Sequence, residues 1–184
     1  MPMTSFDTLD LPEKLHTTLL AVYDFFSKHK RLPRVLNDED AQEMLNLARS
    51  SNASGLKSMK DGCEGFDPRE IDESIVLNTA RYAETQISPL CMFWGGIIAQ
   101  EVIKYTGQYT PLKQWLHHEF FSCLPSEKNL SRTLETKERY SDYVALFGDE
   151  LVKKCSESKV LLVGANEIGN EMVKILGAMG MSRK

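Results

Sequence analysis

Apolar residues recur at helical spacing in four segments of the first two-thirds of the chain. Residues 12–30 carry one such face, formed by Leu15, Leu19, Val22 and Phe26, and Pro33 marks its end. A second helix is predicted from Asn37, whose side chain can cap it, with an apolar face of Ala41, Met44, Leu45 and Ala48. A third is predicted from Asp67 and Pro68 to Thr85, with Ile71, Ile75 and Tyr82 facing inward. The fourth runs from Ser88 to Gly107 and carries the widest face, formed by Leu90, Phe93, Trp94, Ile97, Ile98, Val102 and Tyr105. Four such helices in roughly 100 residues indicate a bundle.

Two segments lack a hydrophobic period: residues 50–66 are predicted to be a loop between the second and third helices, and residues 124–138 a linker. After residue 111 the pattern is no longer that of a helical bundle. The aromatic stretch 115–121 favours a short strand. Residues 149–155 predict a short helix, 160–163 a buried strand and 168–179 a helix that follows a glycine turn. The last two elements resemble the opening βα unit of a nucleotide-binding sheet.

Composition narrows the possible partners and environments. The 184 residues are 42% hydrophobic and 26% charged, as in ordinary globular proteins, and the net charge of −4 argues against a nucleic-acid partner. The four cysteines, at positions 63, 91, 123 and 155, are too far apart for a zinc or redox pair and favour a reduced, intracellular protein. No secretory signal is recognised, and the apolar stretch 89–99 is well short of the ~20 residues that cross a bilayer, so no membrane partner is expected.

One hexapeptide could carry chemistry. Gly164-Ala165-Asn166-Glu167-Ile168-Gly169 places its outer glycines where a G-x-G-x-x-G phosphate loop has them, but Asn166 replaces the middle glycine. Glu167 adds a negative charge near the place of the phosphate. Two interpretations stay open from these residues alone: a degenerate nucleotide loop, or an ordinary strand–turn–helix connection.

Other chemically active side chains give no site. His117 and His118 are adjacent, so a strand would point them to opposite faces, and no cysteine has the context of a nucleophile. We assign no catalytic residue and no metal ligand.

An ordered series of motifs resembles one family. Ser88-Pro89, the stretch 95–104 (GGIIAQEVIK), Thr106-Gly107, Gln114-Trp115, the stretch 144–151 (VALFGDEL) and the stretch 168–172 (IGNEM) are similar to a contiguous segment of ubiquitin-activating enzymes of the single-chain type. The upstream stretches 31–34 (RLPR) and 37–41 (NDEDA) resemble the four-helix bundle of that family. The resemblance extends from about Leu11 to Gly180.

The resemblance implies a fold and a division into domains. It implies a mainly α chain, in which a four-helix bundle is followed by a short strand and the opening βα unit of a Rossmann-like adenylation domain. Residues 1–10 would be a tail, 11–87 helices of the bundle, and 88–124 the last helix and the end of the inactive adenylation half. Residues 125–138 would be the linker, and 139–184 the truncated start of the active adenylation half.

The resemblance also implies an activity for the full-length protein. Family members use ATP and magnesium to adenylate the C-terminus of ubiquitin, transfer it to an enzyme cysteine and pass it to a conjugating enzyme. The loop residues Gly164, Ala165, Asn166, Glu167 and Gly169 would correspond to a degenerate ATP loop. The expected partners are ubiquitin and conjugating enzymes, and the expected location is the cytoplasm, with the nucleus as a second compartment. The chain alone is expected to be inactive and to bind no nucleotide tightly.

Several positions depart from the family pattern. Asn166 and Glu167 stand where the family has glycine and alanine, and Tyr143 stands where it usually has glutamine. Asn170 stands where cysteine is common, and the stretch 181–184 departs as well. Two alternatives to an activating-enzyme fragment remain. One is a non-catalytic helical interaction module derived from the family, and the other is a dinucleotide-dependent oxidoreductase, which has no further support in the sequence.

Overall fold

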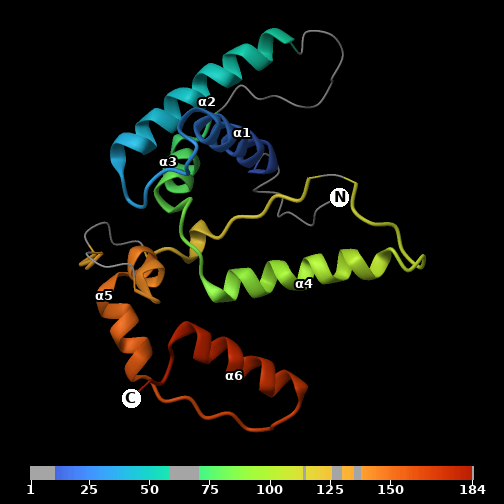
Figure 1. The fold of residues 1–184 in the computed structure, drawn as a ribbon, viewed down its shortest axis with the longest axis vertical. Helices are drawn as coiled ribbons and strands as arrows, with labels where there is room; N and C mark the ends of the chain where they lie inside the picture. The colour runs from blue at the N-terminus through green and yellow to red at the C-terminus, as the bar shows by residue number, and fades with distance from the viewer. Residues whose placement is uncertain (1–10, 59–70, 114, 126–129, 135–137, 184) are drawn as a thin grey trace. The chain divides into compact units, whose positions relative to one another are not determined.

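The structure is a computed structural model that describes residues 11–58, 71–113, 115–125, 130–134 and 138–183. Within these ranges the chain is helical and contains no β-strand (Figure 1). The helices are α1 (Leu11–His29), α2 (Asp38–Ser58), α3 (Glu73–Tyr82), α4 (Ser88–Lys104), the 3₁₀ turn η2 (Phe121–Cys123), α5 (Ser141–Glu157) and α6 (Glu167–Met179). None of the described helices is both long enough and apolar enough to span a bilayer.

The chain divides into two compact units. The first contains Met1–Glu84 and Trp115–Cys123, and the second contains Thr85–Gln114 and Leu124–Lys184. The first unit therefore holds α1, α2 and α3, and the second holds α4, α5 and α6. Each unit is described separately below.

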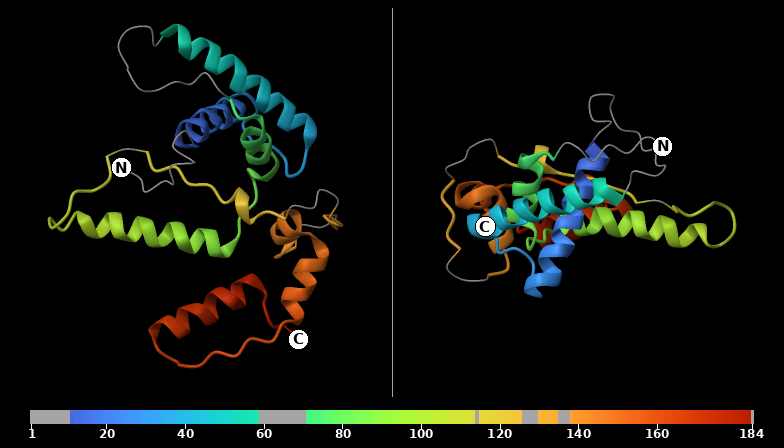
Figure 2. Two further views of the ribbon diagram at one scale, coloured as in Figure 1. Left: turned by 180° about the vertical axis from the view of Figure 1, so that it is seen from behind. Right: turned by 90° about the horizontal axis from the view of Figure 1, so that it is seen from above.

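The first unit has a closely packed core. Helices α1, α2 and α3 contact one another pairwise, as both faces of the ribbon show (Figures 1 and 2). Its core consists of Ala21, Phe25, Ala41, Met44, Leu45, Ala48, Val76 and Ala80. The small alanines allow the helices to approach closely around Phe25 and Met44, which are fully buried. These three helices form the bundle-like part of the chain.

The predicted face of α2 is confirmed, whereas that of α1 is rotated. All four residues predicted on α2 are buried. On α1, however, Leu19 and Phe26 are 38% and 48% exposed, and the helix packs through Leu15, Thr18, Ala21 and Phe25. Thr18 can be buried because its hydroxyl donates to the main-chain oxygen of Lys14 at 2.8 Å. Because α2 approaches closely, α1 packs through the face that carries the small residue Ala21. The spacing of the large apolar residues alone does not predict this face.

Two helix boundaries also differ from the prediction. Helix α2 continues to Ser58, so the first part of the loop predicted over 50–66 is helical, and the remainder lies outside the described residues. Adding residues to an existing helix costs little free energy compared with starting one, which favours this extension. The Ser51 hydroxyl also donates to the Asp24 carboxylate on α1 at 2.5 Å and ties the extended part of α2 to α1. Helix α3 begins at Glu73 with Asp72 as its cap, while the predicted start at Asp67 is outside the described residues. The Asp72 carboxylate accepts from the amides of Ser74 and Ile75, which satisfies two donors at the helix start.

The two predicted strands are absent from the described structure. Residues 115–120 are irregular and are followed by the turn η2, which begins at Phe121. Residues 160–163 are also irregular. A strand requires hydrogen bonds to a neighbouring strand, and no described segment supplies one here. Their apolar composition is therefore not sufficient to form a sheet within this chain.

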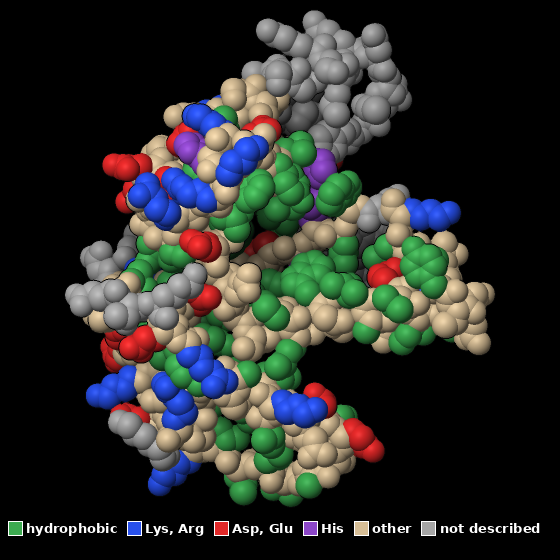
Figure 3. Space-filling view, in the orientation of Figure 1, with side chains coloured by type: hydrophobic (Ala, Val, Ile, Leu, Met, Phe, Trp, Pro, Cys, Tyr) green, Lys and Arg blue, Asp and Glu red, His purple; other side chains and the backbone are tan. Residues whose placement is uncertain are grey.

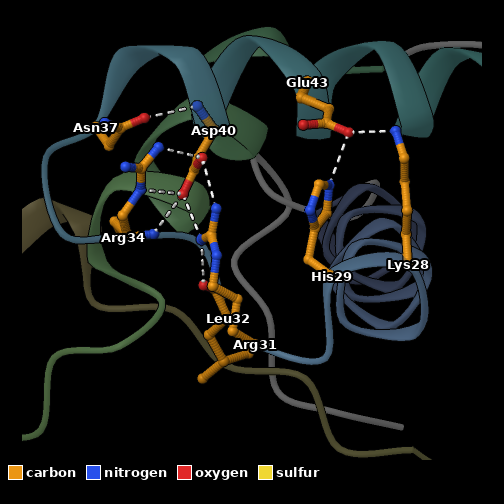
Figure 4. A network of polar contacts seen from close by, with 8 residues as sticks. All are labelled: Lys28, His29, Arg31, Leu32, Arg34, Asn37, Asp40 and Glu43. Atoms are coloured by element: carbon orange, nitrogen blue, oxygen red, sulfur yellow. Dashed lines mark hydrogen bonds and ion pairs between the residues drawn. The ribbon is translucent and has the colours of Figure 1, made fainter.

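The turn between α1 and α2 is organised by Asp40, whose side chain is 5% exposed. Its carboxylate accepts from the Arg31 guanidinium at 2.6 and 3.1 Å, and from the Arg34 main-chain amide at 2.8 Å and guanidinium at 3.0 and 3.1 Å (Figure 4). Asn37 caps α2 as predicted, because its side-chain oxygen accepts from the Asp40 amide at 2.8 Å. The hydrogen bonds from Arg31 and then Arg34 hold the pKa of Asp40 well below its usual range. One carboxylate thereby joins the end of α1, the turn and the start of α2.

The second unit is held together by contacts to the starts and ends of its helices. The hydroxyl of Tyr143 accepts from the Ser88 amide at 3.1 Å, and Asp142 accepts from the Gln86 amide at 3.0 Å, so α5 anchors the start of α4. Helix α5 bends at Gly148, whose φ of 79° places the next residue on a new helical segment. That second segment contains the helix predicted over 149–155. Helix α4 contacts α6 but has no buried residue, so its wide predicted apolar face is largely exposed in this chain.

We predict that Asp40→Asn lowers the free energy of unfolding of the first unit by about 2–4 kcal/mol at neutral pH, because it removes the negative charge and replaces one of the two acceptor oxygens with an amide donor that faces the two guanidinium groups. A depressed carboxyl pKa contributes stability that is present above about pH 4 and is lost as the pH falls. The variant should therefore also show a weaker acid dependence in urea denaturation followed by circular dichroism.

Glu39→Gln is the control, because Glu39 is 90% exposed and lies 3.8 Å from Arg34. It should leave the denaturation midpoint almost unchanged. Equal losses in the two variants would mean that Asp40 does not organise the turn.

Candidate functional site

The five residues predicted to form a nucleotide loop lie at the start of α6. Gly164, Ala165 and Asn166 precede the helix, and Glu167 and Gly169 belong to its first turn. The chain leaves the irregular segment 160–163, turns at Gly164 with a φ of 105°, and enters the helix at Glu167. Asn166 is the N-cap residue and has an extended backbone, with φ −87° and ψ −174°. The connection between the predicted strand and helix is thus a short turn that ends in a capped helix.

The outer two glycines are required by the geometry of this turn. Gly169 is buried, and a Cβ atom built on it would lie 2.4 Å from the main-chain oxygen of Gly164. Gly164 has a positive φ, which L side chains rarely adopt. Glycine is therefore needed at 164 for the backbone angle and at 169 for the close approach of the helix to the turn.

Asn166 has a role that the sequence pattern did not predict. Its side-chain oxygen accepts from the Gly169 amide at 2.9 Å, and its main-chain oxygen accepts from the Asn170 amide at 2.9 Å. Asparagine is among the preferred N-cap residues, and an N-cap side chain accepts from the amide three residues later. Asn166 directly before the predicted helix was therefore the sequence signal for this cap. Glu167 follows in the first turn of α6, where its negative charge interacts favourably with the helix dipole.

These residues meet only part of what a nucleotide phosphate needs. Gly164 and Gly169 fit the tight turn and the close helix packing of such loops. The Gly169 amide, however, already donates to the Asn166 side chain, and the exposed carboxylate of Glu167 stands at the same helix end. Phosphate binding at a helix start depends on available amides and on positive potential. The loop with Asn166 and Glu167 therefore suits a turn that leads into a capped helix, and it does not suit a bound phosphate.

Helix α6 is also fixed at its far end. Gly180 has a φ of 74° and its amide donates to the main-chain oxygen of Gly177, while the Met181 amide donates to that of Leu176. The ring of Tyr140 packs against Gly180, and the guanidinium of Arg183 lies 4.2 Å from the centre of that ring. Both ends of α6 are thus defined by contacts within the second unit.

Apolar side chains around the loop are largely exposed. Leu161 and Val163 are 87% and 88% exposed, and Ile168 on α6 is 71% exposed. The space-filling view shows further apolar side chains at the surface along α4 and α6 (Figure 3). Large exposed apolar surfaces are typical of faces that pack against other protein segments.

Two histidines of the first unit, His16 and His117, form a pair that the sequence did not indicate. His16 Nδ1 lies 3.1 Å from His117 Nε2, which joins α1 to the segment 115–123. Burial and then the neighbouring His16 lower the pKa of His117.

In the described part of the chain no three His, Cys, Asp or Glu side chains come together as a metal site. Cys91 and Cys123 are exposed, and Cys155 is half-buried; all three are free thiols.

Sequence comparisons relate the chain to one group of enzymes. Residues 1–52 match the family described as the ubiquitin-activating enzyme E1 four-helix bundle. Ubiquitin-like modifier-activating enzyme 1 of Homo sapiens is 34% identical over 183 residues, which cover 97% of this chain. Ubiquitin-activating enzyme E1 1 of Candida albicans is 34% identical over 185 residues and 97% of the chain. Ubiquitin-like modifier-activating enzyme 7 of Mus musculus is 32% identical over 172 residues and 91% of the chain. The chain spans 17% of the length of each of these three relatives. The resemblance stated from the sequence is confirmed.

We predict that Gly169→Ala destabilises the start of α6, because its Cβ cannot fit beside the Gly164 carbonyl unless the turn moves. Amide hydrogen exchange should become at least about tenfold faster at the first turn of α6, which corresponds to ~1.4 kcal/mol. Gly177→Ala in the same helix is the control, because nothing lies within 4 Å of its added Cβ. It should slow exchange or leave it unchanged, since alanine favours helix by up to about 1 kcal/mol.

We also predict a pH-dependent contact between α1 and the segment 115–123. A histidine pKa lowered by folding contributes stability that is complete above the unfolded value of about 6.5 and declines as the pH falls below it. NMR titration of the His117 ring should give a pKa below that value, and His16→Gln should raise it. His118→Gln should leave it unchanged, and a His117 pKa insensitive to His16 would contradict the pairing.

Proposed function

Because this chain is related along 97% of its length to one segment of the ubiquitin-activating enzymes, we propose that it is a structural segment of such an enzyme. The full-length protein would use ATP and magnesium to adenylate the C-terminus of ubiquitin and would then form a thioester with it. Ubiquitin and ubiquitin-conjugating enzymes would be its partners, in the cytoplasm and the nucleus. The observation that carries this proposal is the extent of the match, which reaches from α1 to α6 and is not limited to one motif.

The two units have different roles in this proposal. The first unit contributes helices to the four-helix bundle, which the family match over residues 1–52 supports. Residues 88–124 complete the inactive adenylation half; of these, 115–123 belong to the first unit and the others to the second. Residues 139–184, in the second unit, begin the active half, with 125–138 as the linker. The chain supplies scaffold to both halves and no catalytic side chain.

The segment 160–163 becomes a strand when the remainder of the adenylation half is present. Leu161 and Val163 would lie on one face of that strand, and Val160 and Leu162, which are 47% and 36% exposed here, on the other. A strand that is apolar on both faces is typical of a parallel sheet covered by helices on both sides. Further strands and helices of the enzyme would provide both the hydrogen-bond partners and the cover, and the unit would then be Rossmann-like.

The alternative is a helical interaction module that has no role in catalysis. The closely packed core of the first unit favours it, because three helices bury Phe25, Met44 and Val76 without any contribution from an adenylation domain. The size of the protein in its source cell separates the two possibilities. An antibody against the first unit should detect a band several times heavier than 20.9 kDa if the chain acts within an activating enzyme.

An exchange experiment tests the scaffold role directly. We expect this chain to replace the aligned segment of human ubiquitin-like modifier-activating enzyme 1 and give a folded protein, because the two segments are homologous over 183 residues. Two chimeras should be compared, one with the natural loop and one with Asn166→Gly and Glu167→Ala, the residue types that the family has there. Ubiquitin-dependent pyrophosphate exchange and thioester formation should appear in the loop-restored chimera.

A folded loop-restored chimera without activity would contradict the scaffold proposal. The isolated 184-residue chain is the negative control and should catalyse neither step. Comparison of the two chimeras separates a failure of the scaffold, which would affect both, from an effect of the loop residues, which would affect one.

A further inference from the structure

We propose that Asn166 closes the start of α6 to nucleotide phosphate by capping the helix with its own side chain. The inference rests on the proposed function, since it concerns the loop of the adenylation half. It identifies Asn166 as the residue that determines the phosphate affinity of this loop, with Glu167 as an electrostatic contributor. Nucleotide would then bind here only by displacing the cap.

The hydrogen bonds of the turn show how the cap operates. Two amides in the first turn of α6 are bonded to Asn166, that of Gly169 through the side chain and that of Asn170 through the main chain. The side-chain oxygen of Asn166 therefore occupies a position from which an anion would accept the Gly169 hydrogen bond. A phosphate must compete with an intramolecular acceptor that has no entropy of association to lose.

Charge at the same helix end acts in the same direction. Glu167 is exposed and belongs to the first turn, so it adds a negative charge at the helix end that an anion would approach. The lysine of α6, Lys174, is ion-paired with Glu171 at 2.5 Å. Like charges repel, and the carboxylate thus reduces the positive potential that a helix start otherwise offers to phosphate.

The backbone at Asn166 makes the proposal testable without distorting the turn. Its extended conformation suits any residue, whereas Gly164 and Gly169 preserve the geometry of the turn by themselves. Asn166→Gly removes the side-chain acceptor, and glycine is itself tolerated at an N-cap. Asn166→Asp is the matched control, because aspartate also caps a helix and keeps the position occupied.

The experiment is an NMR titration of the 184-residue chain with inorganic pyrophosphate, following the Gly169 amide. In the natural chain this amide should be protected from exchange and should respond only weakly to pyrophosphate. In Asn166→Gly it should exchange faster, and its resonance should shift on titration, with an affinity at least about fivefold higher than in the natural chain. Adding Glu167→Gln should strengthen the response further, and Asn166→Asp should show none.

Two results would overturn the proposal. One is unchanged exchange at Gly169 in Asn166→Gly, which would mean that no cap exists. The other is a titration response that is equal in the natural chain and the variant, whether both bind or neither does, while the helical circular dichroism shows both to be folded. Neither result depends on the scaffold role, which the chimeras test separately.

Discussion

The first unit depends on the hydrogen bonds that the Asp40 carboxylate accepts from Arg31 and Arg34. This carboxylate is almost fully buried and accepts from two arginines and a main-chain amide, so that the end of α1, the turn and the start of α2 are joined at one point. A buried charge without its partners would be strongly destabilising. The start of α2 must therefore keep Asp40 next to both arginines, which restricts the direction in which α2 leaves the turn. The close packing of Phe25 against the small residues of α2 follows from that direction, and α3 then completes the core.

The second unit is organised by contacts at the ends of its helices. Tyr143 and Asp142 hold the peptide that starts α4, and Tyr140 packs against the glycine that ends α6. Helix α4 has no buried residue, and the segment before α6 exposes Leu161 and Val163. A unit with defined helix ends and uncovered apolar faces is what we expect of a segment that completes its core with other parts of a larger enzyme.

The turn before α6 combines a retained backbone geometry with altered side chains. Gly164 and Gly169 satisfy the same steric demands as in a phosphate loop, because a helix must pass close to the preceding turn in either case. Asn166 and Glu167 instead serve the helix itself, one as a cap and the other through the dipole. A helix start can be stabilised by its own side chains or by a bound anion, and in this chain the side chains do so.

The sequence by itself determined where most helices lie, the inward face of α2, the cap at Asn37 and the positions of the two loop glycines. These features depend on local spacing and on the conformational range of single residues, which the sequence contains directly. The resemblance to ubiquitin-activating enzymes was also present in the order of the motifs.

Only the tertiary structure decided the face of α1, the pairing of His16 with His117 and the partner of Tyr143, because each depends on a segment distant along the chain. The same reason explains why residues 160–163 form no strand here: their apolar pattern is suitable, but a strand exists only through the neighbour that bonds to it. The hydrogen bond from Gly169 to Asn166 was likewise decided in three dimensions, because the spacing permits a cap and the fold of the turn brings donor and acceptor within 2.9 Å.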